Sequence, residues 1–234
     1  MKHVILLAIL FAPHGILFSQ ESSAYSSHAV FVYEHGSAIS PDGRKMVTVD
    51  RVGKETPDTE MIVRSERTIL RARVRFGLNA EVLWSSDSEA FAITGSAEGA
   101  NGQFQTDVFY VDSDRLRRVP LTLLLERAFG HPVRCGWPEV PNVVAVEWIE
   151  PSRSLLLATQ IIRHSNCDSY GTFAGFVVDL EKMRVVRRLD QIAMKRQVGA
   201  HLGHELRDAN DSCILRPKSC YIPANHPELS RPPQ

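Results

Sequence analysis

The sequence lacks the short motifs that identify common catalytic centres. It has no Gly-x-Ser-x-Gly elbow of a serine hydrolase, and its glycine-rich stretch, residues 94–105, has no Gly-Lys-Ser/Thr for binding phosphate. It also has no Cys-x-x-Cys pair, the usual spacing of a cysteine-built zinc site. From the sequence we therefore assign no catalytic residue, no cofactor and no metal ligand.

An excess of charge of either sign is absent too. Lysine and arginine together number 27, as do aspartate and glutamate, so the formal net charge is zero. Nucleic-acid binders and proteins that bind anionic membranes usually carry a basic excess. Beyond the N-terminus, no apolar run reaches the roughly 20 residues of a membrane-spanning helix. We expect neither a nucleic-acid partner nor a membrane span in the mature chain.

Residues 1–24 have the pattern of a secretory signal peptide. Lys2 and His3 precede an apolar run, Val4–Ala12, and the small residues Ser22, Ser23 and Ala24 suit a signal peptidase. We expect cleavage near Ala24 and a periplasmic or secreted protein. A short membrane anchor or a buried N-terminal strand is the alternative. No cysteine lies near the cleavage site, so we expect no lipoprotein anchor.

The chain has four cysteines, an even number, which favours disulfides in an exported protein. Our preferred pairs are Cys135–Cys167 and Cys213–Cys220, the second closing a short loop. Cys135–Cys213 is an alternative, because both residues follow a predicted helix. The sequence does not decide among the three connectivities.

A tight turn that leads into a strand recurs along the chain. In Ile39–Asp50, Pro41 presets φ for the turn, Asp42 can bond its own backbone, and Gly43 can take a positive φ. Weaker copies occupy residues 83–94 and 147–159. Trp84 and Trp148 hold the position just before the turn, where Ile39 stands in the first copy. A large ring there is suited to cap the edge of a sheet or to fill the space between neighbouring sheets.

A second kind of hairpin follows each of these turns. Residues 108–119 and 176–187 both read as an apolar strand, an acidic turn and a basic strand, and residues 61–74 are a poorer copy. Each unit thus predicts four antiparallel strands. Units of this size are typical of repeat architectures, four-stranded propeller blades among them.

The Ser-Pro-Asp-Gly turn, the apolar strand after it and the following strand-Asp-x-x hairpin resemble the WD40-like (PD40) propeller repeat of the TolB type. The resemblance covers about residues 29–190 in three copies, of which only the first has the full signature. Ile39 and Trp84 are 45 residues apart, whereas Trp84 and Trp148 are 64 apart. The resemblance implies an exported bacterial protein that binds other proteins, and it carries over no catalytic residue. Three copies are too few for a closed propeller, which leaves an open stack, a further sheet from the chain ends, or a likeness of the hairpin alone.

Two helices are expected between or after these units. Residues 121–130 predict a short helix, with Thr122 as its cap and Gly130 at its end. Residues 190–207 predict the longest helix, capped by Asp190 and weakened by Gly199 and Gly203.

Two groups of residues are candidates for a site. Arg71, Arg73 and Arg75 alternate with apolar residues; they form either a surface for an anion or acidic partner, or a solvated strand face that blocks edge pairing. His201 and His204, followed by Glu205, resemble part of a zincin helix, but their spacing is i, i+3 where a zincin has i, i+4. Two surface histidines on a glycine-interrupted helix are the preferred interpretation of the second group.

Together these observations predict a mainly β protein of repeated four-stranded antiparallel sheets, which form either a propeller-like array or an incomplete propeller, with two short inserted helices. Residues 1–24 form the signal peptide, 25–223 one β-rich repeat domain and 224–234 a flexible tail. We expect a non-enzymatic binding or scaffold protein of the bacterial envelope, contacting a protein partner through loops such as 94–105 and 163–170. The alternative is a small exported metal-dependent hydrolase that uses His201 and His204.

Overall fold

A computed structural model describes residues 23–32, 36–51, 59–74, 76, 80–97, 102–130, 140–162, 171–211 and 214. The predicted signal segment up to residue 22, the tail 224–234 and all four cysteines lie outside these residues. Export and the disulfide pairs therefore remain predictions. No helix in the described part of the chain has the length and apolar character needed to cross a membrane.

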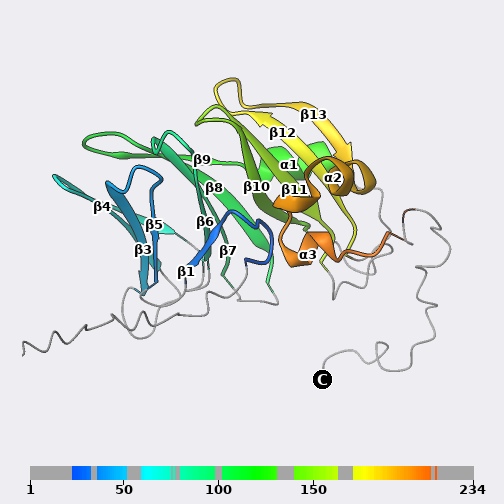
Figure 1. The fold of residues 1–234 in the computed structure, drawn as a ribbon, viewed down its shortest axis with the longest axis horizontal. Coiled ribbons are helices and arrows are strands. Elements are labelled where there is room, and N and C mark those ends of the chain that lie inside the picture. Colours follow the sequence, from blue (N-terminus) through cyan, green and yellow to red (C-terminus); the bar gives the residue numbers. More distant parts are fainter. Residues whose placement is uncertain are drawn as a thin grey trace, which may run out of the picture.

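Three antiparallel sheets stand side by side along the molecule (Figure 1). Sheet 1 has the order β2 (Ser37–Ile39), β3 (Lys45–Arg51), β4 (Thr59–Ser65) and β5 (Ile69–Val74). Sheet 2 has the order β1 (Val30–Val32), β6 (Ala80–Trp84), β7 (Ala90–Ser96), β8 (Phe104–Val111) and β9 (Leu116–Pro120). Sheet 3 has the order β10 (Asn142–Glu150), β11 (Ser154–Gln160), β12 (Phe173–Asp179) and β13 (Arg184–Asp190). The predicted unit of four consecutive antiparallel strands is confirmed in all three sheets.

The strand β1 departs from strict chain order. It precedes sheet 1 in the sequence but pairs with β6 of sheet 2, where Val30 lies opposite Val82 and Val32 opposite Ala80. Sheet 2 thereby has five strands. The chain crosses between sheets 1 and 2 twice, which ties the first repeat to the second.

The three repeat turns share one backbone feature. Gly43, Ser88 and Ser152 have φ values of 72°, 61° and 52°, and each lies four residues after Ile39, Trp84 or Trp148. A positive φ strains a residue with a side chain, so its recurrence at one position shows that the turns are structural copies.

The first two turns also share their hydrogen bonds. Asp42 Oδ1 accepts from Ser40 Oγ at 2.6 Å and from the Arg44 N–H at 3.0 Å. Asp87 Oδ1 accepts from Ser85 Oγ at 2.7 Å and from the Glu89 N–H at 3.0 Å. The third turn has neither serine nor aspartate at these places, and β10 beside it is irregular in register.

Neighbouring turns are bonded to one another through the residue with positive φ. Ser88 Oγ accepts from the Asp42 N–H at 3.1 Å, and Ser152 Oγ donates to Asp87 Oδ1 at 2.7 Å. The serine of each repeat thus reaches back to the aspartate of the repeat before it. Gly43 has no side chain for this bond, in keeping with its place in the first repeat.

The tryptophans join the sheets in the same direction. Trp84 Nε1 donates to the Ala38 carbonyl of sheet 1 at 3.2 Å, and Trp148 Nε1 donates to the Leu83 carbonyl of sheet 2 at 3.0 Å. Each ring therefore bonds the preceding sheet and packs against the cluster between the two sheets, which agrees with one of the two places that the sequence predicted for it. Ile39, at the same place in the first repeat, is 61% exposed.

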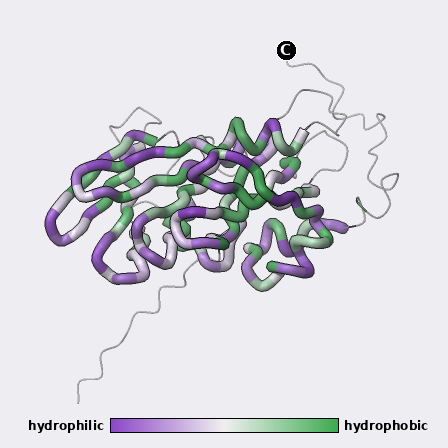
Figure 2. The backbone as a smooth tube through the Cα atoms, turned by 90° about the horizontal axis from the view of Figure 1, so that it is seen from above, coloured by the Kyte–Doolittle hydropathy of each residue, from purple (hydrophilic) through white to green (hydrophobic). Residues whose placement is uncertain are grey.

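Apolar clusters fill both gaps between the sheets, and Figure 2 shows hydrophobic positions within the strands and hydrophilic ones at the turns. The cluster between sheets 1 and 2 consists of Val32, Ala38, Val47, Val49, Met61, Val63, Val74, Phe76, Ala80, Val82, Phe91, Ile93 and Phe109. The cluster between sheets 2 and 3 includes Leu83, Val108, Val143, Leu155, Leu157, Phe176 and Val178. β11 lies centrally in sheet 3 with nearly every residue buried, as its lack of alternation predicted.

The helix α1 (Thr122–Phe129) follows sheet 2 and packs into the cluster between sheets 2 and 3. Leu121 and Leu125 are fully buried there. Gly130 ends the helix with φ 68°, as predicted. The predicted cap was wrong: Thr122 is the first helical residue, and Leu121 holds the cap position without a side-chain bond.

The predicted single helix over residues 190–207 is broken in three. It consists of α2 (Gln191–Val198), the short 3-10 helix η2 (Gly199–His201) and α3 (His204–Arg207). The Asp190 cap is confirmed, since its Oδ1 accepts from the Ala193 N–H at 2.7 Å. These helices cover the outer face of sheet 3, where Val144, Leu156, Met194, Leu202 and Leu206 share a buried cluster.

The break between η2 and α3 is where the N-terminal segment docks. The Gly203 N–H donates to the Tyr25 carbonyl at 2.9 Å, and Ser26 bridges to Leu202. A Cβ on Gly203 would lie 2.4 Å from backbone atoms of Ala24. Only glycine, which has no side chain, allows the two backbones to come this close. The helix ends here, and the Gly203 N–H bonds the N-terminal segment.

A buried carboxylate holds the same N-terminal segment from the other side. Glu81 of β6 is 5% exposed and accepts from the Ala24 N–H at 2.5 Å and the Tyr25 N–H at 3.2 Å. Burial raises the pKa of Glu81, while these backbone bonds act against that rise.

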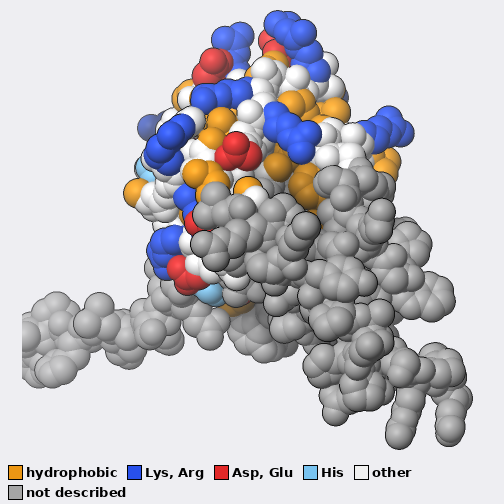
Figure 3. Space-filling view, turned by 90° about the vertical axis from the view of Figure 1, so that its right-hand side faces the viewer, with side chains coloured by type: hydrophobic (Ala, Val, Ile, Leu, Met, Phe, Trp, Pro, Cys, Tyr) orange, Lys and Arg blue, Asp and Glu red, His pale blue; other side chains and the backbone are white. Residues whose placement is uncertain are grey.

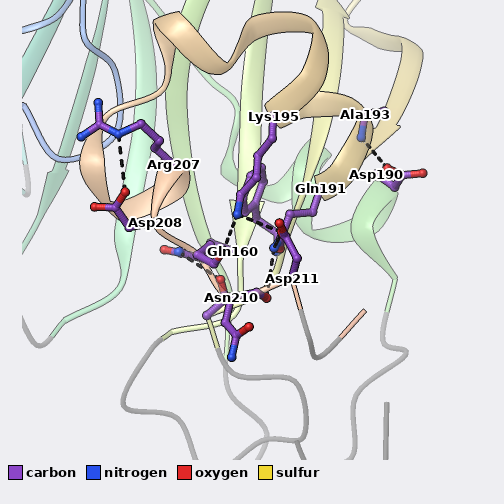
Figure 4. Close-up of polar contacts among 12 residues, drawn as sticks. Gln160, Asp190, Gln191, Ala193, Lys195, Arg207, Asp208, Asn210 and Asp211 are labelled. Atoms are coloured by element: carbon purple, nitrogen blue, oxygen red, sulfur yellow. Dashed lines mark hydrogen bonds and ion pairs between the residues drawn. The ribbon is translucent and has the colours of Figure 1, made fainter. Parts of the chain in front are cut away.

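The chain beyond α3 folds back onto α2 (Figure 4). Lys195 Nζ lies 2.8 Å from Asp211 Oδ1, and Gln191 Nε2 donates to the same oxygen at 2.6 Å. Gln191 is fully buried, and its Oε1 accepts from the Phe173 N–H at 3.0 Å. These bonds fix the end of the described chain against sheet 3.

The pKa of the turn aspartate in the second repeat, Asp87, predicts that the stability of the protein depends on pH. Burial would raise the pKa of Asp87, but bonds from Ser152, the Glu89 N–H and Ser85 outweigh it and lower the pKa below 3.8. Its stabilisation is thus present above pH 3.8 and lost as the pH falls through the lower folded-state pKa. We expect Asp87→Asn to cost about 1 kcal/mol at pH 7 and little near pH 2, measured by urea unfolding.

The matched control is Asp114→Asn, which changes an exposed carboxylate in the β8–β9 turn. Its unfolding free energy should differ from that of the unchanged protein by less than about 0.5 kcal/mol at pH 7. A cost for Asp87→Asn that is the same at both pH values would contradict the assignment.

Candidate contact surface

The outer face of sheet 1 is the end of the repeat array. In the strand register, Ile39, Met46, Arg64 and Ile69 form one row across this face. Ile39 is 61% and Ile69 58% exposed, and Met46 is half-buried between them. We name this row, together with Asp50, Glu60, Arg71 and Arg73 beside it, the end face. Ile39 and Ile69, at the two ends of this row, are open to solvent, whereas Ile62 in the middle of the same sheet face is 3% exposed.

Charged side chains lie both in that row, at Arg64, and beside it. Arg71 forms an ion pair with Glu60 of the neighbouring strand, and Arg73 lies opposite Glu60 in the register. Asp50 continues the same row on β3. Arginine around an apolar centre is common in protein interfaces, where lysine is depleted.

The sequence placed Arg71, Arg73 and Arg75 on one strand face. Arg71 and Arg73 are exposed on β5, while Leu70, Ala72 and Val74 point into the cluster between sheets 1 and 2, as predicted. Arg75 lies outside the described residues. β5 is an outer edge of its sheet, so these arginines also suit the interpretation that they block edge pairing.

Exposed arginines also occur on the last strands of sheets 2 and 3. β9 and β13 carry the exposed arginines Arg117, Arg118, Arg184, Arg187 and Arg188. Lysine and arginine side chains are prominent in the view from the sheet 3 end of the molecule (Figure 3). Several are engaged within the chain: Arg118 pairs with Asp107 at 2.6 Å, and Arg117 stacks over the Tyr110 ring at 3.9 Å.

An open cleft of about 560 Å³ adjoins the end face where the turns of sheet 1 meet the β8–β9 turn. Asp42, Arg44, Lys45, Ser65, Glu66, Arg67, Thr68 and Ser113 line it. Lys45 Nζ is bonded to the Ser88 carbonyl at 2.7 Å and so belongs to the repeat turns. The cationic side chains of Arg44 and Arg67, which line this cleft, are exposed to solvent.

The predicted binding loops lie largely outside the described residues. β7 ends at Ser96 and β8 begins at Phe104, but residues 98–101 between them and all of residues 163–170 are not described. Their role in binding stays a prediction.

The two histidines of the predicted zincin-like helix lie in different elements. His201 ends η2 and His204 begins α3. His204 Nε2 lies 3.7 Å from Glu205 Oε1. In the described part of the chain, the group of side chains spaced to hold a metal joins His201 with His28 and Glu147, and His204 is not in it.

Sequence reasoning missed His28, Glu147 and Glu81. The first two are far from His201 in the sequence, and each belongs to a different element, so no spacing could link them. Glu81 lies in an otherwise apolar strand, Ala80–Trp84, which is the only signal that could have marked it as buried.

Comparisons with known proteins add little to this geometry. No family model matches the chain, and no curated protein matches its sequence. One solved structure that resembles it is an acylaminoacyl peptidase from Pyrococcus horikoshii, with 13% identity and a TM-score of 0.35. The match covers 62% of this chain and 23% of that one. A likeness this slight supports no argument about activity.

Proposed function

We propose that this chain is an exported, non-enzymatic binding or scaffold protein of the bacterial envelope, and that its protein partner docks on the end face of sheet 1. The exposure of Ile39, at the position where Trp84 and Trp148 are packed against a preceding sheet, carries the proposal. The end face offers the surface that the internal repeats use for contact with one another.

The two ends of the array differ in a way that supports this choice. The outer face of sheet 3 is covered by α2, η2 and α3, which bury Leu156, Met194 and Leu202. Among the described residues, no helix covers the outer face of sheet 1 (Figure 1). Terminal units of repeat proteins usually have polar outer faces, so two exposed isoleucines at one end favour a docking site.

The chemistry of the end face indicates the kind of partner. Ile39 and Ile69 suit an apolar patch or a sheet face, and Arg64 and Arg73 beside them suit acidic groups at its rim. A folded envelope protein with an apolar patch rimmed by carboxylates meets both requirements.

Photo-crosslinking from the end face tests the proposal. With a photoreactive amino acid at position 39 or 69 in producing cells, we expect one identified partner as the main adduct. For that purified partner, Ile39→Asp should weaken binding at least tenfold, because a charge would be buried against the apolar patch of the partner. Its unfolding free energy should stay within about 0.5 kcal/mol of the unchanged protein.

The control is Val186 on β13, which is 49% exposed but lies on sheet 3. A photoreactive residue there should give no adduct with the same partner, and Val186→Asp should leave binding unchanged. Equal crosslinking from both positions, or an adduct made only of two copies of this chain, would contradict the proposal.

A further inference from the structure

A group of three side chains lies where the two ends of the described chain meet. His28 comes from the N-terminal segment, Glu147 from β10 and His201 from η2. One ligand atom of each residue lies within 4.8 Å of the others. We propose that these residues form a binding site for one divalent transition-metal ion of the zinc type.

The contact between His201 and Glu147 supports this assignment. Nδ1 of His201 lies 2.6 Å from Glu147 Oε2, yet this buried nitrogen makes no hydrogen bond of acceptable geometry. Two ligands 2.0–2.1 Å from a tetrahedral zinc ion are about 3.3 Å apart. The Nδ1–Oε2 distance is shorter than that value, and all three ligand atoms lie within 4.8 Å of one another, so small side-chain rotations would bring them around one ion.

The ring of His28 faces the ring of His201. Their centroids are 4.6 Å apart and the planes are inclined by 40°. A tilted pair at this distance can direct one nitrogen of each ring towards a common point, with the Glu147 carboxylate on the third side. Two imidazoles and a carboxylate suit zinc and related ions, whereas calcium and magnesium prefer oxygen ligands.

The backbone beside each ligand is already held in place. The Ser27 N–H donates to the His201 carbonyl at 3.0 Å, and Ser26 Oγ donates to the Val146 carbonyl at 2.7 Å. The first bond joins the neighbour of His28 to His201, and the second joins Ser26, two residues before His28, to the neighbour of Glu147. The backbone that carries the three side chains is thus held by the fold before any ion binds, and only the side chains have to adjust.

An ion bound at this site would join the two ends of the described domain. We call this link the clasp. A bound ion would link the N-terminal segment to β10 and to η2, and would lock the contacts that cover the outer face of sheet 3. Three protein ligands leave one position of a tetrahedral ion for water. The clasp does not depend on the proposed partner, because the end face lies on sheet 1.

Zinc titration of the exported chain tests the site. The purified protein, with its thiols left unreduced, is treated with chelator, dialysed and titrated with zinc chloride by calorimetry. We expect one zinc ion per chain. At a hundredfold excess of free zinc over Kd, Tm should rise by about 5–10 °C. Amide exchange at Ser27 should slow at the same time, because its N–H is bonded to His201.

The deciding variants are His28→Ala and Glu147→Gln, each expected to weaken zinc binding at least tenfold. His28 is exposed, so His28→Ala should keep the chelator-treated Tm of the unchanged protein. His204→Ala is the control and should bind zinc normally, because His204 is outside the group. Absence of zinc binding, or binding that survives His28→Ala but not His204→Ala, would overturn the assignment.

Discussion

Replacing Gly203 by alanine should lower the free energy of unfolding by about 3 kcal/mol and Tm by about 6–12 °C. The new Cβ would lie 2.4 Å from the backbone carbonyl group of Ala24 and 2.5 Å from the backbone nitrogen of Tyr25, the residue that follows the predicted signal peptide, and no flexible side chain there can move aside. The N-terminal segment would have to move away, and the bond from the Gly203 N–H to the Tyr25 carbonyl would be lost with it. Thermal unfolding followed by circular dichroism measures the effect.

Gly199 provides the control, four residues earlier in the same region. It has helical dihedral angles, φ −56° and ψ −33°, and a Cβ built on it meets nothing within 4 Å. Gly199→Ala should therefore be neutral or stabilise the fold by up to about 1 kcal/mol, because alanine reduces the freedom of the unfolded chain. If the two variants lost equal stability, steric contact with Ala24 could not be the cause.

Replacing Phe91 by alanine should cost about 4 kcal/mol and lower Tm by about 8–16 °C. Phe91 is fully buried, and its ring lies 4.9 Å from the ring of Trp84 and 5.6 Å from that of Phe109. These rings belong to sheet 2 and pack in or against its cluster with sheet 1. The truncation leaves a cavity at the joint between the first two repeats.

Urea unfolding checks this cost and its distribution. Phe91→Leu keeps most of the volume and should cost less than about 1.5 kcal/mol. Both variants should unfold in one transition, because the sheets share apolar clusters on both sides of sheet 2. A separate early transition of sheet 1 in the alanine variant, with the rest unaffected, would show that the repeats fold independently.

Local chemistry explains why the sheets could be predicted from the sequence. Pro41, Asp42 and Gly43 encode a chain reversal within a few residues, and alternation such as that of Leu70 to Val74 encodes the face that is buried. Both signals act over short distances. The three units, their strands and the end of α1 at Gly130 follow from them.

Features that depend on distant parts of the chain could not be predicted in this way. The pairing of β1 with sheet 2 depends on Val82, about 50 residues away from Val30. The helix break at Gly203 depends on Ala24, and the grouping of His28, Glu147 and His201 depends on three separate elements. The outward placement of Arg71 and Arg73 was predicted from their alternation, whereas the exposure of Ile39 required the arrangement of the sheets.

The joining of the two ends of the domain has a consequence for the order of events during synthesis and export. Ser27 Oγ bonds the Ala200 carbonyl across 173 positions of sequence. Sheet 3 can form before residues 191–209 emerge, but its outer face then lacks Met194, Leu202 and Leu206, and its own Leu156 and Val144 face water. A nascent chain at that stage exposes apolar surface to which chaperones or other nascent chains bind. This apolar surface is covered only when residues 191–209 have been made and pack against sheet 3 and the N-terminal segment.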